Sequence, residues 1–483
     1  MSNIPENDAR KLDGKENVLF NVPNLGLQAL FAFNTNLIII FYINILGLPA
    51  LYAGAVISIS LVVSAFLCPI WGALSDRIST RIGRKKTIMA FSGPLLFLSF
   101  ILIWNPPTPP TSASFGALSI PIAIWIAITV ISFNLMGGAF QTSYLSMIPE
   151  ISTEEENRVK ISITNSIMMF LGAALGIISP ILIFGTATED LGRNDPSLFY
   201  PISPVGREIY ASVALMSILF ARLFLGGLIL MLFSIKEPPM PSPHDSSVSI
   251  SDIFKDIFGP FRDHNYRTYI LSFFLMFSAI NMFNTIVFNF ATYVLNIRGN
   301  EFFIMAGFAL ASTIGSYIGF DKLSQKLGLK RVMEICLIVA TLSFLSVLIL
   351  TLPMPFSLKF MLGILIVSFS FIGFVGAMIF PVAIVSSLID IAQKRDKKNL
   401  SGSYLGSFTM TSSLAGGAGM LLISIFLQFF GPEASVSYVL ILLLGGILVF
   451  IASLIFKNVN LDREHSMLEN PINKNDKKKE RNL

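Results

Sequence analysis

The sequence is poor in charged residues. Asp, Glu, Lys and Arg make up 13% of its 483 residues, about half of the roughly 25% that soluble globular proteins contain. Between Glu16 and Asp76 there is no charged side chain at all. Because about 20 apolar residues let a helix cross a bilayer, this stretch has room for two crossings. The shortage of charge argues against a soluble enzyme and indicates a protein that spans the membrane several times.

Cysteine and histidine are also scarce. The two cysteines, Cys68 and Cys336, lie inside apolar runs, and the three histidines lie outside such runs. The sequence shows no nucleophile beside a base, no cluster of metal ligands and no phosphate-binding loop. We therefore expect no enzyme activity, no metal and no cofactor. The net charge of +5 does not indicate nucleic acid, because the charges stand at the ends of the apolar runs.

What the sequence does contain is twelve long apolar runs bounded by charge, Pro or Gly. We predict membrane helices near 18–46, 51–74, 87–104, 119–147, 161–185, 209–235, 267–297, 302–320, 331–352, 358–389, 400–430 and 436–457. If the N-terminus is inside the cell, the outer loops hold only Arg193, Arg207, Arg298 and Lys359. Since basic loops stay cytoplasmic, both termini are expected to be cytoplasmic.

The domain organisation follows from changes in composition. We expect a cytoplasmic tail at 1–17, a six-helix bundle at 18–236, a cytoplasmic linker rich in Pro and Ser at 237–266, a second six-helix bundle at 267–459 and a disordered cytoplasmic tail at 460–483. The fold class is therefore an all-α membrane protein with two pseudo-symmetric bundles.

A charged loop recurs in the two halves. Residues 76–86 read DRISTRIGRKK and residues 321–331 read DKLSQKLGLKR, with nine of eleven positions identical or conservative. The loops lie 245 residues apart and follow the second and the eighth predicted helix. Duplication of a six-helix unit explains this recurrence.

With this loop the chain resembles the major facilitator superfamily. The residues that match the family's motif between helices 2 and 3 are Gly72, Asp76, Arg77, Gly83, Arg84 and Lys85. The resemblance implies alternating access, with this loop as a cytoplasmic gate of charge-assisted pairs. The alternative is a loop that only orients the helices through its positive charge. The full set of predicted gate residues is Gly72, Asp76, Arg77, Arg81, Gly83, Arg84, Glu150, Arg158, Asp321, Lys322, Lys326, Gly328 and Asp390.

More narrowly, the chain resembles the glycoside-pentoside-hexuronide:cation symporters, which include melibiose carriers. The residues that carry this likeness are Gly47-Leu-Pro before the second helix, Ser146-Met-Ile-Pro-Glu150 and Gly402-Ser-Tyr-Leu-Gly406. That family places carboxylates and basic partners at its cation and sugar positions. At those places this chain has neutral residues: Gln28, Ser64, Cys68, Gln141, Asn165 and Ser413. Coupling to sodium or a proton is therefore left open.

Neutral polar residues remain on helices 1, 4, 5 and 7. Their amides donate and accept together, which suits a polyhydroxylated solute. The predicted binding residues are Asn24, Gln28, Phe31, Thr35, Asn134, Gln141, Tyr144, Asn165, Asn281, Asn284 and Asn289. The alternative is that these side chains join helices through hydrogen bonds. Arg222, near the middle of helix 6, either attracts an anionic solute or has a structural role, and we favour the structural role.

We therefore expect a monomeric multi-pass carrier in the cell membrane that moves a small neutral organic solute, a sugar or glycoside. A carrier of lysolipids or other amphipathic solutes, favoured by the 43 Phe residues, is one alternative. A membrane sensor that transports nothing is another.

Overall fold

The computed structural model describes residues 12–77, 80, 82–107, 120–151, 155–187, 204–235, 237, 255, 257–396 and 401–460. Within these ranges the chain is helical and contains no strand. Twelve helices there are long and apolar enough to cross a membrane. The prediction of an all-α protein with twelve crossings is therefore confirmed.

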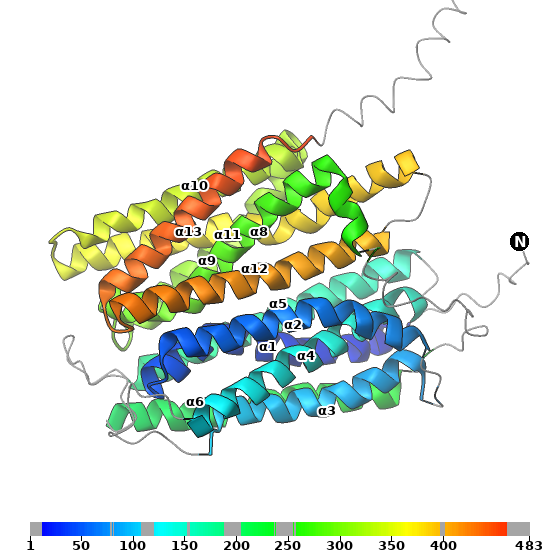
Figure 1. The fold of residues 1–483 in the computed structure, drawn as a ribbon, viewed down its shortest axis with the longest axis horizontal. Coiled ribbons are helices and arrows are strands. Elements are labelled where there is room, and N and C mark those ends of the chain that lie inside the picture. Colours follow the sequence, from blue (N-terminus) through cyan, green and yellow to red (C-terminus); the bar gives the residue numbers. More distant parts are fainter. Residues whose placement is uncertain are drawn as a thin grey trace, which may run out of the picture. The chain divides into compact units, whose positions relative to one another are not determined.

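The helices are shown in chain order in Figure 1. The first six are α1 (Gly14–Ile39, extended by the π-helix η2, Ile40–Ile45), α2 (Ala50–Arg77), α3 (Arg84–Trp104), α4 (Ile120–Ile151), α5 (Glu155–Ala187) and α6 (Pro204–Ser234). After the short 3₁₀-helix η5 (Gly259–Arg262) come α8 (His264–Asn289, extended by the π-helix η6, Phe290–Val294), α9 (Glu301–Leu327), α10 (Leu329–Leu345, extended by the 3₁₀-helix η7, Ser346–Thr351), α11 (Phe356–Asp396), α12 (Ser401–Phe430) and α13 (Ser435–Phe456).

The start of α1 illustrates how local chemistry sets a helix boundary. Apolarity alone predicts a start near residue 18, but the helix begins at Gly14 because Asp13 and Glu16 form a capping box. The Asp13 carboxylate accepts the Gly14 N–H at 2.7 Å, and the Asp13 N–H donates to Glu16 Oε2 at 3.3 Å. The cap satisfies amides that the first helical turn leaves unpaired.

The described chain forms two compact units. Unit 1 comprises Met1–Val248, Asn281–Gly307 and Gly416–Ile441, and unit 2 comprises Ser249–Ile280, Phe308–Ala415 and Leu442–Leu483. Unit 1 therefore contains α1 to α6 together with the later parts of α8 and α12 and the first parts of α9 and α13. The division into two six-helix bundles remains a prediction from the repeat.

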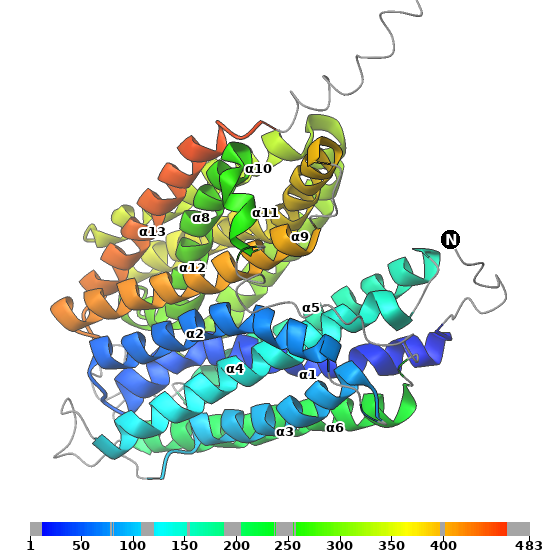
Figure 2. The same ribbon diagram turned by 45° about the vertical axis from the view of Figure 1, so that its right-hand side comes forward.

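Helix α1 lies at the centre of unit 1, packed against α5 on one side and α6 on the other. A Cβ atom at Gly172 of α5 would stand 2.1 Å from the Leu25 carbonyl oxygen. A Cβ atom at Gly26 of α1 would stand 2.4 Å from Phe224 Cα in α6. Backbone meets backbone at both crossings, which is how small residues bring membrane helices together. In the same unit α3 and α6 lie side by side in both views (Figure 1 and Figure 2).

The two π-helices end in the same way. In η2 the Leu46 N–H bonds to the Phe41 carbonyl at 2.8 Å, and in η6 the Leu295 N–H bonds to the Phe290 carbonyl at 3.2 Å. The residue after each leucine has a left-handed backbone, with φ of 70° at Gly47 and 55° at Asn296. The equivalent positions lie 249 residues apart, close to the spacing of the charged loops. This recurrence supports duplication independently of the loop motif.

Candidate functional site

The polar side chains of α1 connect it to α4 and α5. Asn24 Nδ2 donates to Asn165 Oδ1 at 2.5 Å. The Tyr144 hydroxyl donates to Asn21 Oδ1 at 2.6 Å and to Asn165 Oδ1 at 3.1 Å. All four side chains are buried. Three of the predicted binding residues, Asn24, Tyr144 and Asn165, therefore lie together and join three helices.

Other predicted binding residues are only half-buried and keep free hydrogen-bonding capacity. Gln28 donates to Asn24 Oδ1 at 3.4 Å, which leaves the Gln28 carbonyl oxygen available. Within the described ranges, Thr35 on α1, Gln141 on α4 and Asn284 on α8 make no hydrogen bond. Side chains of this kind can bind a solute without breaking a helix contact.

Three further predicted binding residues lie against other parts of the protein. The half-buried Phe31 ring stands edge-on to Phe133, with centroids 5.5 Å apart, and a Cβ atom at Gly137 would stand 2.9 Å from its Cζ atom. Asn281 is half-buried, and a Cβ atom at Gly416 of α12 would lie 3.9 Å from its amide. Asn289 is fully buried and bonds to Asn44 and Tyr438.

Neutral side chains join α2 to α4 near Ser64 and Cys68, two of the positions where the sequence predicts that a cation site has lost its charge. Ser64 Oγ donates to the Asn134 carbonyl at 3.1 Å, and Asn134 Nδ2 donates to Ser60 Oγ at 2.8 Å. Cys68 Sγ lies 3.6 Å from Ser64 Oγ and would be 2.6 Å from a Cβ atom at Gly138. Asn134, a predicted binding residue, is half-buried here, and its amide joins α4 to α2.

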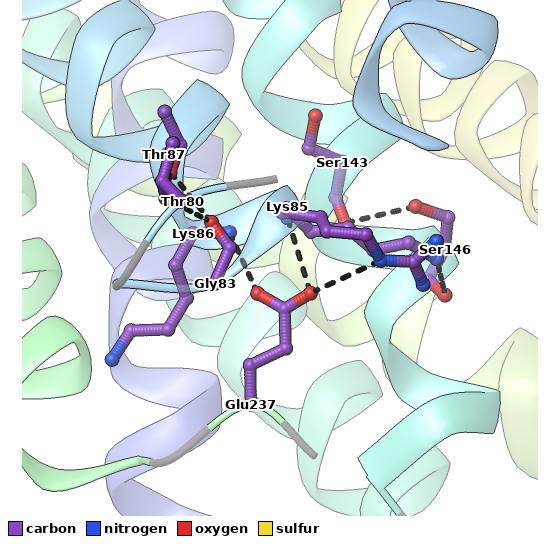
Figure 3. Close-up of polar contacts among 9 residues, drawn as sticks. Thr80, Gly83, Lys85, Lys86, Thr87, Ser143, Ser146 and Glu237 are labelled. Carbon is purple, nitrogen blue, oxygen red and sulfur yellow. Dashed lines mark hydrogen bonds and ion pairs between the residues drawn. The ribbon is translucent and has the colours of Figure 1, made fainter. Parts of the chain in front are cut away.

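The charged loop leads into α3, and a residue missed by the sequence analysis holds this junction. The carboxylate of Glu237, which follows α6, accepts the backbone N–H of Lys85 at 3.2 Å and that of Lys86 at 3.1 Å (Figure 3). Its Oε1 atom lies 4.0 Å from Arg84 Nε, and only 3% of the Glu237 side chain is exposed. A carboxylate at a helix N-terminus is stabilised by the unpaired amides and the helix dipole.

Two lysines complete this junction. Lys86 Nζ donates to the carbonyls of Leu232 and Ile235 at 2.6 and 2.7 Å. These carbonyls lie where α6 ends, so no further helical turn supplies an amide for them. Lys85 Nζ donates to the Ser146 carbonyl of α4 at 2.6 Å. Both lysines are buried. The Glu237 carboxylate at the start of α3 and the lysine ammonium groups in the C-terminal parts of α6 and α4 complement the dipoles of these helices. Together these contacts connect α3, α4 and α6.

The backbone at Gly83 explains why the motif needs glycine. Its φ is +119°, and a Cβ atom there would stand 2.2 Å from Glu237 Oε2. Gly328, the equivalent residue in the second half, has φ +79° and precedes α10 in the same way. Lys330 Nζ then donates to the Lys457 carbonyl at the end of α13 at 3.1 Å. Lys330 thus contacts the end of the sixth helix of its half, although the repeat aligns it with Lys85 rather than with Lys86.

The structure describes the surroundings of only some of the predicted gate residues. Arg84 approaches Glu237, and Lys322 and Lys326 are exposed on α9. The surroundings of the remaining ones lie outside the described residues; these are Gly72, Asp76, Arg77, Arg81, Glu150, Arg158, Asp321 and Asp390. One sequence signal did point to Glu237, since it is the only acid between Glu208 and Asp245. Arg222 is exposed on α6, and it has no ion pair among the residues that the structure describes.

One protein-family model matches nearly the whole chain, and several known proteins match parts of it. The family model described as "MFS/sugar transport protein" matches residues 19–457. The isoprimeverose transporter of Lactiplantibacillus pentosus is 24% identical over 169 residues, which are 35% of this chain and 33% of that protein. A putative sulfoquinovose importer of Salmonella typhimurium is 26% identical over 40% of this chain and 39% of its own length. The sodium-dependent lysophosphatidylcholine symporter 1 of Xenopus tropicalis is 27% identical over 28% of this chain and 25% of its own length.

Similar folds are found among solved structures. The nucleoside transporter NupG has a TM-score of 0.62 at 13% identity, with 92% of this chain and 98% of that chain covered. A D-xylose-proton symporter has a TM-score of 0.58 at 17% identity, with 92% and 97% covered. These likenesses confirm the fold, while the matches to the curated relatives span 25 to 39% of those proteins' lengths.

Proposed function

The chain belongs to the MFS/sugar transport protein family, and from this premise we propose that it carries a small neutral organic solute, a sugar or glycoside, across the cell membrane. It is a multi-pass membrane transporter by its family and its twelve apolar helices. The family description and two relatives named for isoprimeverose and sulfoquinovose favour a sugar.

The observation that carries the proposal is the set of half-buried neutral polar side chains, Gln28, Thr35, Gln141 and Asn284. Amide and hydroxyl groups both donate and accept, so they match the hydroxyl groups of a sugar. A buried amide or hydroxyl group that finds no hydrogen-bond partner on the solute costs free energy. A solute without hydroxyl groups would therefore bind less tightly than a sugar. The buried joint of Asn24, Tyr144 and Asn165 would hold the helices that present these groups.

Alternating access supplies the transport mechanism. In this proposal the charged loop closes the cytoplasmic side, and Asp76 with its basic partners forms pairs that break when that side opens. The junction of Glu237 with α3 would make the loop move as one body with α6. Solute binding shifts the equilibrium between the states open to either side only by the difference in the solute's affinity for these two states.

A carrier of lysophospholipid or a similar amphipathic solute is the second candidate. It is favoured by the relative named a sodium-dependent lysophosphatidylcholine symporter. Aromatic side chains such as Phe31, half-buried beside Gln28, would suit an acyl chain.

Uptake into proteoliposomes tests the proposal. We expect labelled sugars or glycosides from a panel to enter vesicles that hold the protein, and lysolipids to enter no faster than into empty vesicles. Imposed sodium and proton gradients, applied separately, measure coupling. Saturable uptake of lysolipid without sugar uptake would support the second candidate, and the absence of any flux would contradict transport.

Variants of the free polar groups locate the site. Gln141→Ala and Thr35→Val are each expected to raise the KM for the transported solute by roughly threefold to tenfold, the effect of one lost hydrogen bond. Thr409→Val is the matched control, because Thr409 is exposed and its hydroxyl donates to the Leu405 carbonyl of its own helix. An unchanged KM in both site variants would place the solute elsewhere.

A further inference from the structure

Helix α6 carries a positive charge on a side that is otherwise apolar. Arg222 is exposed, and it has no ion pair or hydrogen bond among the residues that the structure describes. Its neighbours at alternating spacings of three and four residues are exposed as well; they are Leu215, Leu219, Gly226, Ile229 and Phe233. This spacing places all six positions along one side of the helix. We call these six residues the α6 face.

Arg222 lies near the middle of its membrane span. The nearest acids along the chain are Glu208, which is 14 residues before it, and Glu237, which is 15 residues after it. At 1.5 Å per residue these acids are about 21 and 22 Å away along the helix axis. Half of the hydrocarbon core of a bilayer is about 15 Å thick. Pairing with a lipid headgroup would require the arginine side chain, or the lipid phosphate, to cross most of that distance.

The helices around α6 supply no carboxylate for this charge. A cation near the bilayer centre is costly unless an acid or backbone carbonyls pair with it. Helix α6 packs against α1, α3 and α5, and the apolar parts of these three helices contain no Asp or Glu. The exposed guanidinium of Arg222 therefore points to an anionic group from outside unit 1.

A second copy of this chain does not supply the missing carboxylate either. The acids of the sequence stand outside the twelve apolar runs or near their ends, as Glu334 does. A symmetric dimer through the α6 face would also bring the two copies of Arg222 together. Like charges repel strongly where the dielectric constant is low. The charge therefore opposes self-association through this face and favours a different protein.

The α6 face has space for a helix beside Arg222. Gly226 lies one turn after Arg222, and a Cβ atom there would meet nothing within 4 Å. The next residue, Gly227, is already packed, since a Cβ atom there would stand 3.0 Å from Val22 of α1. Small residues let membrane helices approach closely. Gly227 serves this purpose inside unit 1, whereas the open position at Gly226 is available to a partner.

We propose that the α6 face binds a membrane-spanning helix of another protein, one with an Asp or Glu near its middle. The Arg222 guanidinium forms a bidentate, charge-assisted pair with that carboxylate. The partner's backbone approaches at Gly226, and its apolar side chains cover Leu219 and Ile229. Each charge alone is costly at this depth, and the pair removes both costs together. This assembly does not depend on which solute crosses the membrane, so it goes beyond the proposed function.

Binding of designed membrane peptides to the whole protein tests the proposal. One peptide is an apolar helix of about 20 Leu and Ala residues with Glu at its centre, and its control has Gln there. A donor dye at Ser234→Cys, exposed at the end of α6, in a Cys68→Ser, Cys336→Ala background, reports energy transfer to the labelled peptide in proteoliposomes. We expect the Glu peptide to bind roughly tenfold or more tightly, because a hydrogen bond to a charged group is lost with Gln. Equal binding of the two peptides would overturn the proposal.

Variants of the protein assign this preference to Arg222. Arg222→Leu is expected to abolish the difference between the two peptides, and Arg222→Lys to keep part of it. The combinations of Arg or Leu with Glu or Gln form a double-mutant cycle, which isolates the energy of the pair. Arg331→Leu is the matched control, because Arg331 is exposed on α10 and has no ion pair or hydrogen bond within the described ranges. A preference for Glu that survives Arg222→Leu would contradict the assigned pair.

The other occupants of the α6 face give different results. If phosphatidylglycerol added to the vesicles removes the preference for Glu, Arg222 pairs with lipid phosphate and the proposal fails. It also fails if donor-labelled and acceptor-labelled copies of the protein show energy transfer that Gly226→Leu abolishes, because the face then binds a second copy. Support requires that Gly226→Leu weaken the binding of both peptides while the protein melts like the parent.

Discussion

Gly172→Leu is expected to prevent stable folding of unit 1. The leucine Cβ would stand 2.1 Å from the Leu25 carbonyl oxygen, and backbone atoms cannot turn away as a side chain can. Overpacking of a well-packed core typically costs about 1–3 kcal/mol and occasionally more, and here α1 and α5 must separate along their crossing. We expect loss of the monodisperse peak in size-exclusion chromatography of the detergent-purified protein.

The control for this prediction is Gly226→Leu on α6. It introduces the same side chain into a helix of the same unit at a position with open space around it. This variant is expected to purify and to melt like the parent protein. Normal behaviour of Gly172→Leu, with a melting temperature equal to that of the control, would mean that α1 and α5 are not packed as described.

Glu237→Ala is expected to destabilise the start of α3 by about 2 kcal/mol, since a helix-dipole contact in a partly buried site contributes up to that much. The substitution also leaves the amides of Lys85 and Lys86 without their acceptor. Faster hydrogen exchange at these two amides, measured by mass spectrometry, is the direct readout. Transport is expected to slow, because the charged loop loses its connection to α6.

Two further variants sharpen the test of Glu237. Glu237→Gln keeps an oxygen acceptor but removes the charge, so its exchange rate is expected to lie between those of the parent and of Glu237→Ala. Glu334→Ala is the matched control, since within the described ranges Glu334 makes no hydrogen bond or ion pair. Equal exchange in Glu237→Ala and Glu334→Ala would show that the carboxylate does not cap α3.

The sequence predicted the features that depend on local composition. Length of apolar runs gave the twelve helices, and the repeated loop placed Gly83 and Gly328 correctly as equivalent residues before α3 and α10. Helix starts were less accurate, because a capping box such as that of Asp13 acts through hydrogen bonds rather than apolarity.

Contacts between distant residues could not be predicted in this way. The sequence shows that Asn24 is a polar residue within an apolar helix, but it does not reveal whether the partner of Asn24 is Asn165 or a solute. Likewise, the lone acid Glu237 lies about 150 positions after the amides that it accepts, and no periodicity connects them. The gate role of Asp76 and its basic partners stays a prediction.

The hydrogen-bonded contacts between the helices of unit 1 are neutral, and this affects how transport depends on the membrane potential. Moving one charge through the membrane field involves about 2.3 kcal/mol per 100 mV. The contact of Ser64 with Asn134 and that of Asn24 with Asn165 contain no charge. With the neutral solute proposed above and no coupled cation, transport would perform little electrical work. Its rate would then follow the solute gradient rather than the membrane potential, whereas a coupled cation would restore the dependence on voltage.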